Sequence, residues 1–247
     1  MGEYQELIAT LALTLGVAWA SGINLYAAVT VLGLSGVMGY IDLPPALELL
    51  QDPLIILAAA FMYCVEFMAD KTPGVDTAWD ALHSFIRIPA GALLAAGAVG
   101  PVNPALAVAA GLLGGTLSAA THATKAGSRV LINTSPEPFS NWMASILEDV
   151  AVFVGLWAAL QHPVVFLLAL LVFLVALCWL LPKLWRGVTA ILRKLGTWLG
   201  LVRRATPPQR SNHGDLERLR SDGLLTEAEY QRAARRIPRQ RSGHLAS

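Results

Sequence analysis

Charged side chains are scarce along most of this chain. Asp, Glu, Lys and Arg make up 14% of the 247 residues, whereas soluble domains average roughly a quarter. Residues 7–41 and 164–182 contain no charged side chain at all. This composition excludes an ordinary soluble domain and predicts an all-α polytopic membrane protein, because a helix needs about 20 apolar residues to cross hydrocarbon.

Cysteines and catalytic motifs are also sparse. Cys64 and Cys178 both lie in apolar runs, so neither a disulfide framework nor a thiolate metal site is expected. The chain has no Walker A loop, no His-Glu-x-x-His motif and no Gly-x-Ser-x-Gly elbow. We therefore expect no cofactor and no nucleic acid partner, and an enzyme is the least favoured functional class.

The apolar runs and turn residues of 1–182 predict about six membrane-spanning helices. We expect the first at about 7–34 and the second from Pro53 to about Asp70. The third kinks at Pro89 and ends at about Val99, and the fourth ends at about Thr124. The fifth is expected at about 141–160 and the sixth at 164–181. The first is interrupted at Ala20–Asn24, a polar stretch that either lines a cavity or packs against a neighbouring helix.

The positive charges predict an orientation. All 18 Lys and Arg residues fall in the connection between spans two and three, in that between spans four and five, or in the C-terminal tail. Connections 35–52, 100–104 and 161–163 contain none. By the positive-inside rule this pattern predicts a multi-pass membrane protein with both termini in the cytoplasm. The acidic start at Glu3 and Glu6 argues against a cleavable signal peptide.

Polar residues collect at a few places between the spans. Residues 66–87 hold seven ionisable side chains, and on a helix four of them would share one face, as would a second set in 118–129. The candidate pathway for a substrate or ion consists of Asn24, Glu66, Asp70, Asp76, Asp80, His83, Arg87, His122, Lys125, Arg129, Asn133, Glu148 and Asp149.

Two interpretations of these residues remain open, structural ion pairs or a site for an ion or small charged solute. A metal site on the carboxylates with His83 and His122 is less favoured. Glu148 is expected to be the most buried carboxylate, and we expect Arg87, Lys125 and Arg129 to lie within ion-pair distance of the acidic residues.

The tail differs from the body in charge. Residues 1–182 hold 12 acidic and 4 basic groups, and residues 183–247 hold 5 acidic and 14 basic groups. We expect a basic amphipathic helix at Lys183–Arg204 on anionic lipids, a linker at 205–213, a helical hairpin at 214–238 and a disordered end at 239–247. The hairpin resembles the short SHOCT domain, which implies oligomerisation or a protein partner.

Several motifs of the body together form a recognisable pattern: Ala20–Asn24, Val31–Leu34, Glu66–Arg87, Pro89–Ala92, His122–Lys125, Arg129, Asn133, Glu148 and Asp149. In these residues the body resembles the bacterial membrane family named domain of unknown function 4126, and we expect the chain to lie in the bacterial inner membrane. The sequence departs from the family pattern at Leu25 and Ile88, where proline is expected. The resemblance implies a membrane protein whose activity is unassigned.

Three functional hypotheses follow. The leading one is a transporter or channel for a small solute or ion, supported by a similarity between Gly16–Asn24 and Gly114–His122 that suggests an inverted three-helix repeat. The second is a membrane scaffold whose tail recruits partners or forms oligomers. The third is an intramembrane enzyme in which His83 or His122 acts as general base and the nearby basic residues bind an anion.

Overall fold

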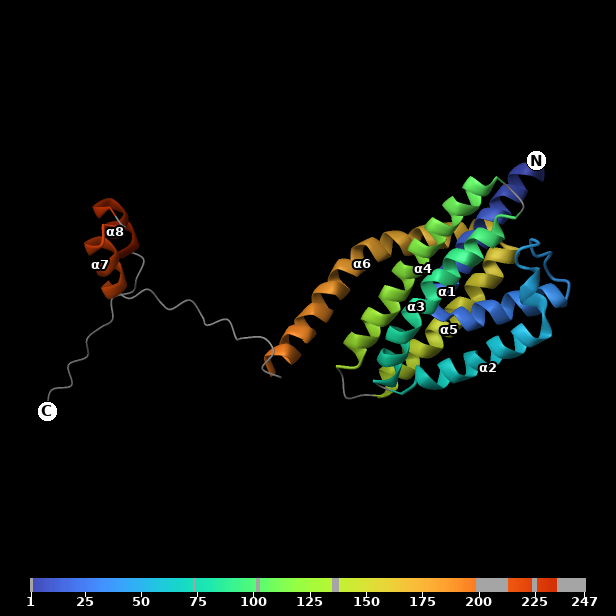
Figure 1. Ribbon diagram of the computed structural model, residues 1–247, viewed down its shortest axis with the longest axis horizontal. Coiled ribbons are helices and arrows are strands. Elements are labelled where there is room, and N and C mark those ends of the chain that lie inside the picture. The colour runs from blue at the N-terminus through green and yellow to red at the C-terminus, as the bar shows by residue number, and fades with distance from the viewer. Residues whose placement is uncertain are drawn as a thin grey trace. The chain divides into compact units, whose positions relative to one another are not determined.

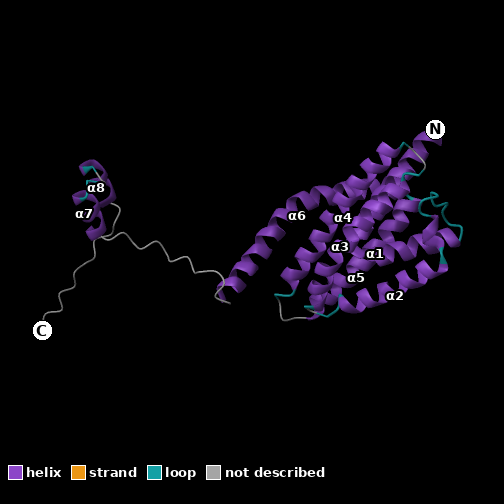
Figure 2. Ribbon diagram, viewed as in Figure 1, coloured by secondary structure: helices purple, strands orange, loops and turns teal. Residues whose placement is uncertain are grey.

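The computed structural model describes residues 2–72, 74–100, 103–134, 138–198, 213–223 and 226–234. Every regular element in these ranges is a helix (Figure 2), so the predicted all-α polytopic fold is confirmed. Among the described residues, five helices are long and apolar enough to cross a membrane: α1 (Gly2–Val37), α3 (Val75–Ala98), α4 (Pro104–Ile132), α5 (Pro138–Gln161) and α6 (Pro163–Trp198). The other expected span, α2 (Pro53–Ala69), has 17 residues and a length of about 25 Å.

Caps and prolines explain where two of these helices begin. The Asp52 carboxylate accepts a hydrogen bond from the Leu54 amide at 2.8 Å, as the sequence predicts, and the short 3-10 helix η1 (Glu48–Gln51) precedes it. Asn103 accepts from the Ala105 amide at 2.9 Å. In both cases a proline follows at the first helical position, where its missing N–H costs no hydrogen bond.

Helices α3 and α4 form a close antiparallel pair (Figure 1). Gly111 and Gly115 of α4 lie against α3, and a Cβ at Gly115 would stand 3.2 Å from that of Ala92. This is the close approach that the small residues of α4 predict. The helix α3 continues through Pro89, and the hydroxyls of Ser21 and Ser118 both donate to the Arg87 carbonyl at 3.0 Å.

The first helix bends sharply at Asn24 (Figure 1), whose backbone leaves the helical region with φ −147° and ψ 96°. We call residues 2–23 the first arm and residues 25–37 the second arm. The side chain of Asn24 accepts from the Ala27 amide at 3.0 Å and thereby caps the second arm. Residues Ser21 and Asn24 bond to Arg87 and Asp149, which lie near the middles of α3 and α5.

Both ends of α1 lie at the same end of the helix bundle. One surface pocket is lined by Glu6 of the first arm, by Asp42 and Pro44 just beyond the second arm, and by Ala98 and Leu160 near the ends of α3 and α5. The chain thus enters the bundle, turns near its middle and returns. The expected interruption at Ala20–Asn24 is confirmed, and the break at Asn24 reverses the course of the chain, so the two arms do not form one straight helix.

Helix α6 reaches the end of the bundle opposite the start of α1. The C-terminal half of α6 lies beside the end of α4, where a Cβ at Gly187 would meet the Leu131 side chain at 2.8 Å. That end is opposite the one where α1 begins, because α3 and α4 are antiparallel and α4 ends beside the start of α3, with Asn133 bonded to Asp76. The start of α1 and Gly187 of α6 therefore lie at opposite ends of the bundle.

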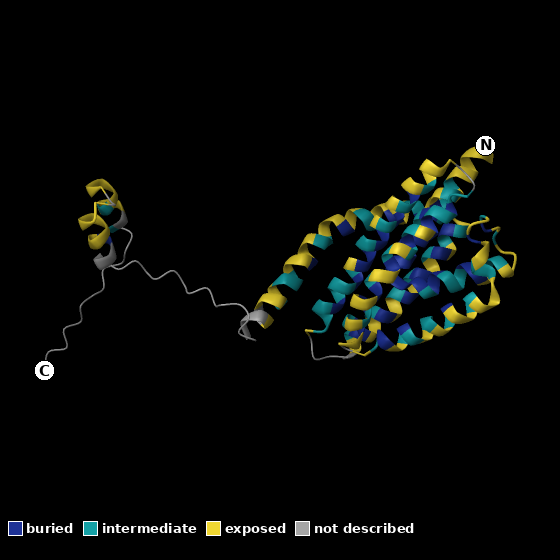
Figure 3. Ribbon diagram, in the orientation of Figure 1, coloured by how far each residue is buried: buried dark blue, intermediate teal, exposed yellow. Residues whose placement is uncertain are grey.

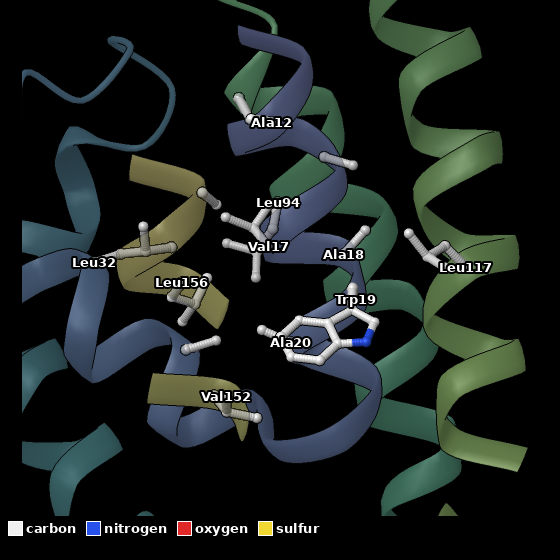
Figure 4. Close-up of a cluster of buried hydrophobic side chains, with 14 of the residues drawn as sticks. Ala12, Val17, Ala18, Trp19, Ala20, Leu32, Leu94, Leu117, Val152 and Leu156 are labelled. Carbon is white, nitrogen blue, oxygen red and sulfur yellow. The ribbon is translucent and has the colours of Figure 1, made fainter. Parts of the chain in front are cut away.

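The apolar core surrounds the first arm. Figure 4 shows Val17 and Ala20 of this arm near Leu94 of α3 and Val152 of α5, and buried residues concentrate along these helices in Figure 3. The ring of Trp19 packs edge-on against Phe166 of α6, with ring centroids 6.1 Å apart. The core therefore holds the bent α1 between the crossing helices.

Two further expectations are corrected. Helix α6 does not stop before Lys183 but continues through Pro182 to Trp198, so the first part of the expected amphipathic helix is an extension of the last span. Residues 114–122 form unbroken helix in α4, whereas the matching segment of α1 ends in a non-helical residue. The expected similarity between these two segments therefore does not extend to a break in α4.

The hairpin belongs to a second compact unit, Arg193–Ser247. It contains α7 (His213–Ser221) and α8 (Glu227–Ala234); Gly223 follows α7 with φ +73°, and the Thr226 amide donates to the Glu229 carboxylate at 3.0 Å, which forms a capping box at the start of α8. The expected linker before His213 and the expected end at 239–247 lie outside the described residues.

Candidate functional site

Seven charged side chains from four helices meet beside the bend of α1. We call them the charged core: Glu66, Asp70, Asp80, Arg87, Lys125, Arg129 and Glu148. Six of the seven side chains are at most 3% exposed, and that of Glu148 is 19% exposed. The expectation that Glu148 is the most buried carboxylate is therefore wrong, since Glu66 is fully buried.

Arg87 is the cation at the centre of α3. Its guanidinium donates to Glu66 at 2.5 Å and to Asp80 at 2.9 Å, and both partners are buried. It also donates to Nδ1 of His122 at 3.1 Å. Such a pair is costly to desolvate, and it holds together only because each charge has a partner in position.

Lys125 joins the charged core to α1. Its ammonium donates to Asp70 at 2.7 Å and to Glu66 at 3.2 Å, and also to the carbonyl of Ile23 at 3.2 Å. The residue after Ile23 is Asn24, where the helix breaks. The backbone carbonyl of Ile23, which the break frees from the helix, thus accepts a hydrogen bond from a buried ammonium group. Partners of this kind are what allow irregular backbone at membrane depth.

Arg129 connects α4 with α5. Its guanidinium donates to Glu148 at 2.6 Å and to the side-chain oxygen of Asn141 at 2.5 Å. It also donates to the Asp70 carbonyl at 3.0 Å, at the end of α2. The structure thus brings Arg87, Lys125 and Arg129 within ion-pair distance of acidic residues, as the cost of lone buried charges requires.

Asp149 lies beside the charged core but outside its ion pairs. The amide of Asn24 donates to its Oδ1 at 3.1 Å, whereas Oδ2 is buried without a hydrogen-bond partner. The residue is 6% exposed. Within the described residues, no Lys or Arg nitrogen comes within 4 Å of its carboxylate.

Asp76 and Asn133 form a separate structural clamp. The Asp76 carboxylate accepts from the amides of Gly74 and Thr77 at the start of α3, and from the Asn133 side chain at 2.8 Å. These bonds tie the start of α3 to the end of α4. Helical spacing predicts that Asp76 shares one face of the helix with Asp80. In the structure Asp76 instead caps the start of α3 and takes no part in the charged core.

His122 forms a bond to Ser84, which is not among the candidate pathway residues. Its Nε2 lies 2.6 Å from the Ser84 hydroxyl and 3.1 Å from the Asp80 carbonyl. Because Arg87 can only donate, Nδ1 of His122 must accept, so the proton of the neutral ring is on Nε2. A histidine in this tautomer cannot take the Ser84 proton, and this geometry argues against an enzyme built on this pair.

His83 lies nearer the second arm of α1. Its Nε2 is 3.1 Å from the Tyr26 hydroxyl, its Nδ1 is 2.9 Å from the Trp79 carbonyl, and the Trp79 ring stacks on it at 4.2 Å between centroids. The donating Nδ1 proton leaves Nε2 to accept from Tyr26. His83 therefore links α3 to α1 and is not part of the charged core.

Lys71 stands at the edge of the site, just after α2. Its ammonium lies 2.9 Å from the centroid of the Phe67 ring and donates to the Ser145 hydroxyl at 3.3 Å. Burial lowers the pKa of the Lys71 amine, and the negative charges of Asp149 and Asp70 oppose this shift. Lys71 is thus a partly exposed cation at the edge of the site whose charge and that of Asp149 attract each other.

The charged core leaves some of its polar atoms unpaired. Among the described residues, one oxygen each of Glu66, Asp70 and Asp80 is buried without a hydrogen-bond partner, and so is Nε of Arg87 and of Arg129. Within the described residues, no group of three His, Cys, Asp or Glu side chains is placed to hold a metal ion. The ion pairs of the charged core therefore leave buried atoms of both donors and acceptors without partners.

Two core-contacting residues could have been found from the sequence. Ser84 follows Asp80 by four positions, and Asn141 precedes Glu148 by seven, so each shares a helix face with a predicted site residue. Ser21 and Thr121 carry no such signal, because their hydroxyls bond to backbone carbonyls on other helices.

Comparison with known proteins identifies one family. The family described as Domain of unknown function (DUF4126) matches residues 11–183, which include α1 to α5 nearly complete and the charged core. No curated protein and no solved structure matches the chain.

Proposed function

The chain belongs to the DUF4126 family, whose name assigns no activity, and we propose that it is a membrane transporter for a small charged solute or ion. The observation that carries the proposal is the position of the break in α1. Asn24 and Ile23 bond directly to Asp149 and to Lys125 of the charged core. Broken helices whose exposed backbone meets charged side chains at mid-membrane are a recurrent feature of solute and ion sites in transporters.

The buried state of the site supports a transporter that alternates between conformations. Arg87, Glu66 and Lys125 are at most 2% exposed, so a solute reaches them only when helices move. The side chain of Glu148 is 19% exposed and pairs with Arg129. It is therefore the point at which the charged core meets the outside in this closed conformation.

The course of α1 supports a revised orientation in the inner membrane. With α1 returning to its starting side, the acidic residues Glu3, Glu6, Asp42 and Glu48 lie at one end of the bundle. The connection that contains Lys71 and the connection that follows α4 lie at the other end of the bundle, as do Lys183 and Arg186 of α6. By the positive-inside rule the second end faces the cytoplasm and the N-terminus faces outward.

The experiment is a flux measurement on the purified protein in proteoliposomes, with protons, Na⁺, K⁺ and inorganic phosphate as probes. Glu66→Gln removes a buried carboxylate from the charged core and should abolish the flux that the wild type shows. Glu48→Gln is the matched control, because Glu48 is exposed at the end of the bundle. Equal flux in both variants, or no flux above protein-free vesicles for any probe, would contradict the proposal.

A truncated protein separates this function from that of a scaffold. Removing residues 211–247 deletes the hairpin α7–α8, which lies outside the compact unit Met1–Leu192 that contains the charged core. A transporter should keep its flux without the hairpin. A cellular phenotype that is lost with the hairpin while flux is unchanged would favour the scaffold.

A further inference from the structure

Two neighbouring carboxylates of α5 have opposite surroundings. Glu148 pairs with Arg129 at 2.6 Å and lies 3.8 Å from Lys125. Within the described residues, Asp149 has no cation within ion-pair range, and the hydrogen bond that it accepts comes from the neutral amide of Asn24. An ionised carboxylate that is buried with one neutral partner is strongly disfavoured, so these surroundings favour a bound proton or cation at Asp149.

The charges around Asp149 indicate the same need. The charged core contains four carboxylates and three cations, and Asp149 adds a fifth carboxylate. The groups that face it are Tyr63 and Asp70 from α2, Lys71 beyond α2, and Lys125 from α4. Lys125 is already bonded to Asp70 and Glu66, and Lys71 lies over the Phe67 ring.

Asn24 connects this carboxylate to the bend of α1. Its side-chain oxygen caps the second arm through the Ala27 amide, and its side-chain nitrogen holds Asp149. A hydrogen bond to an ionised acceptor is roughly twice as strong as one to a neutral acceptor. Protonation of Asp149 therefore weakens the bond that ties the bend of α1 to α5.

We propose that Asp149 is the proton-binding site of this protein and that Asn24 transmits its protonation to the bend of α1. The inference rests on the proposed transport function and names its coupling ion. A proton is favoured over a metal ion because, among the residues that the structure describes, no set of three suitable ligands surrounds Asp149. The free Oδ2 is the atom that takes the proton.

Two measurements on the full protein in lipid nanodiscs test the inference. Infrared difference spectra between low and high pH should show a protonated-carboxyl band that is absent in Asp149→Asn and present in Glu148→Gln. Hydrogen exchange of residues 20–28, corrected for the intrinsic rate at each pH, should accelerate about tenfold when the band appears, because the weakened bond releases the bend. In Asp149→Asn, a neutral mimic, the exchange should be fast at every pH.

Asn24→Ala separates proton binding from its transmission. This variant should keep the carboxyl band and lose the pH dependence of the exchange. A band that persists in Asp149→Asn would overturn the proton site, and a pH response that persists in Asn24→Ala would overturn the link to α1.

The flux assay distinguishes this inference from the proposed function. Solute flux that continues in Asp149→Asn at the wild-type rate and pH dependence would refute proton coupling and leave transport intact. A titrating Asp149 band in a protein without any flux would refute transport, and the proton site would then be a pH switch.

Discussion

Replacing Arg87 by Gln tests whether the charged core is held by its ion pairs. The change removes the partner of Glu66 at 2.5 Å and of Asp80 at 2.9 Å, and both carboxylates remain buried. Breaking a buried pair costs about 3–5 kcal/mol. We expect the lower value, about 3 kcal/mol, because Lys125 still lies 3.2 Å from Glu66 and 3.7 Å from Asp80.

The assay is thermal unfolding of the purified protein in one detergent. A loss of about 3 kcal/mol corresponds to a decrease in Tm of about 6–12 °C for a chain of this size. The double variant Glu66→Gln/Arg87→Gln removes one charge of each sign and restores the net charge of the core. It should therefore be more stable than Arg87→Gln alone, by about 1 kcal/mol or more.

Arg186→Gln is the control, because Arg186 is exposed on α6 and its replacement should leave Tm unchanged within about 2 °C. The argument would be refuted by an Arg87→Gln protein as stable as the wild type. It would also be refuted by a double variant whose loss equals the sum of the two single losses, since independent sites add in this way.

Three further predictions concern packing, pH and lipid. Gly22→Ala should lower the free energy of unfolding by about 2–3 kcal/mol, because its Cβ would overlap a hydroxyl and a carbonyl of α4. The control is Gly127→Ala, whose Cβ would lie 3.6 Å from its nearest neighbour, and it should leave Tm unchanged in the same thermal assay. Hydrogen bonds from Thr226 lower the pKa of Glu229 in the folded protein. The capping box therefore stabilises α8 at pH values above the pKa of a free glutamate, and this stabilisation is lost as the pH falls through the lower pKa of the folded state. The NMR chemical shifts of α8 should show this loss in the wild type and not in Glu229→Gln. Replacing Lys183 and Arg186 by Gln should weaken retention of anionic lipid in native mass spectrometry by about 1 kcal/mol per charge, and unchanged retention would show that the extension of α6 does not bind lipid headgroups.

The face of α4 could be predicted from the sequence because its residues obey helical spacing. Four polar residues lie on one face of α4, about one helical turn apart, and all four are buried: Ser118, His122, Lys125 and Arg129. The same argument failed for Asp76. Helical spacing specifies a direction around an axis, but a residue in the first turn can cap its own helix instead.

The return of α1 could not be predicted in this way. The sequence shows a polar break at Ala20–Asn24, and an uncharged run of this length is also what a crossing helix requires. What reverses the chain is the fit of the bend against distant residues, such as Lys125 on Ile23 and Asp149 on Asn24. These contacts join positions more than 100 residues apart, which no local pattern reports.

The side of the membrane on which the N-terminus lies tests the central claim most directly. In a background without Cys64 and Cys178, Glu3→Cys and Gln161→Cys should react with an impermeant maleimide in right-side-out membrane vesicles. Thr134→Cys, exposed after α4, should react only in inside-out vesicles. If Glu3→Cys instead reacts only in the vesicles that label Thr134→Cys, α1 crosses the membrane and does not return from the charged core.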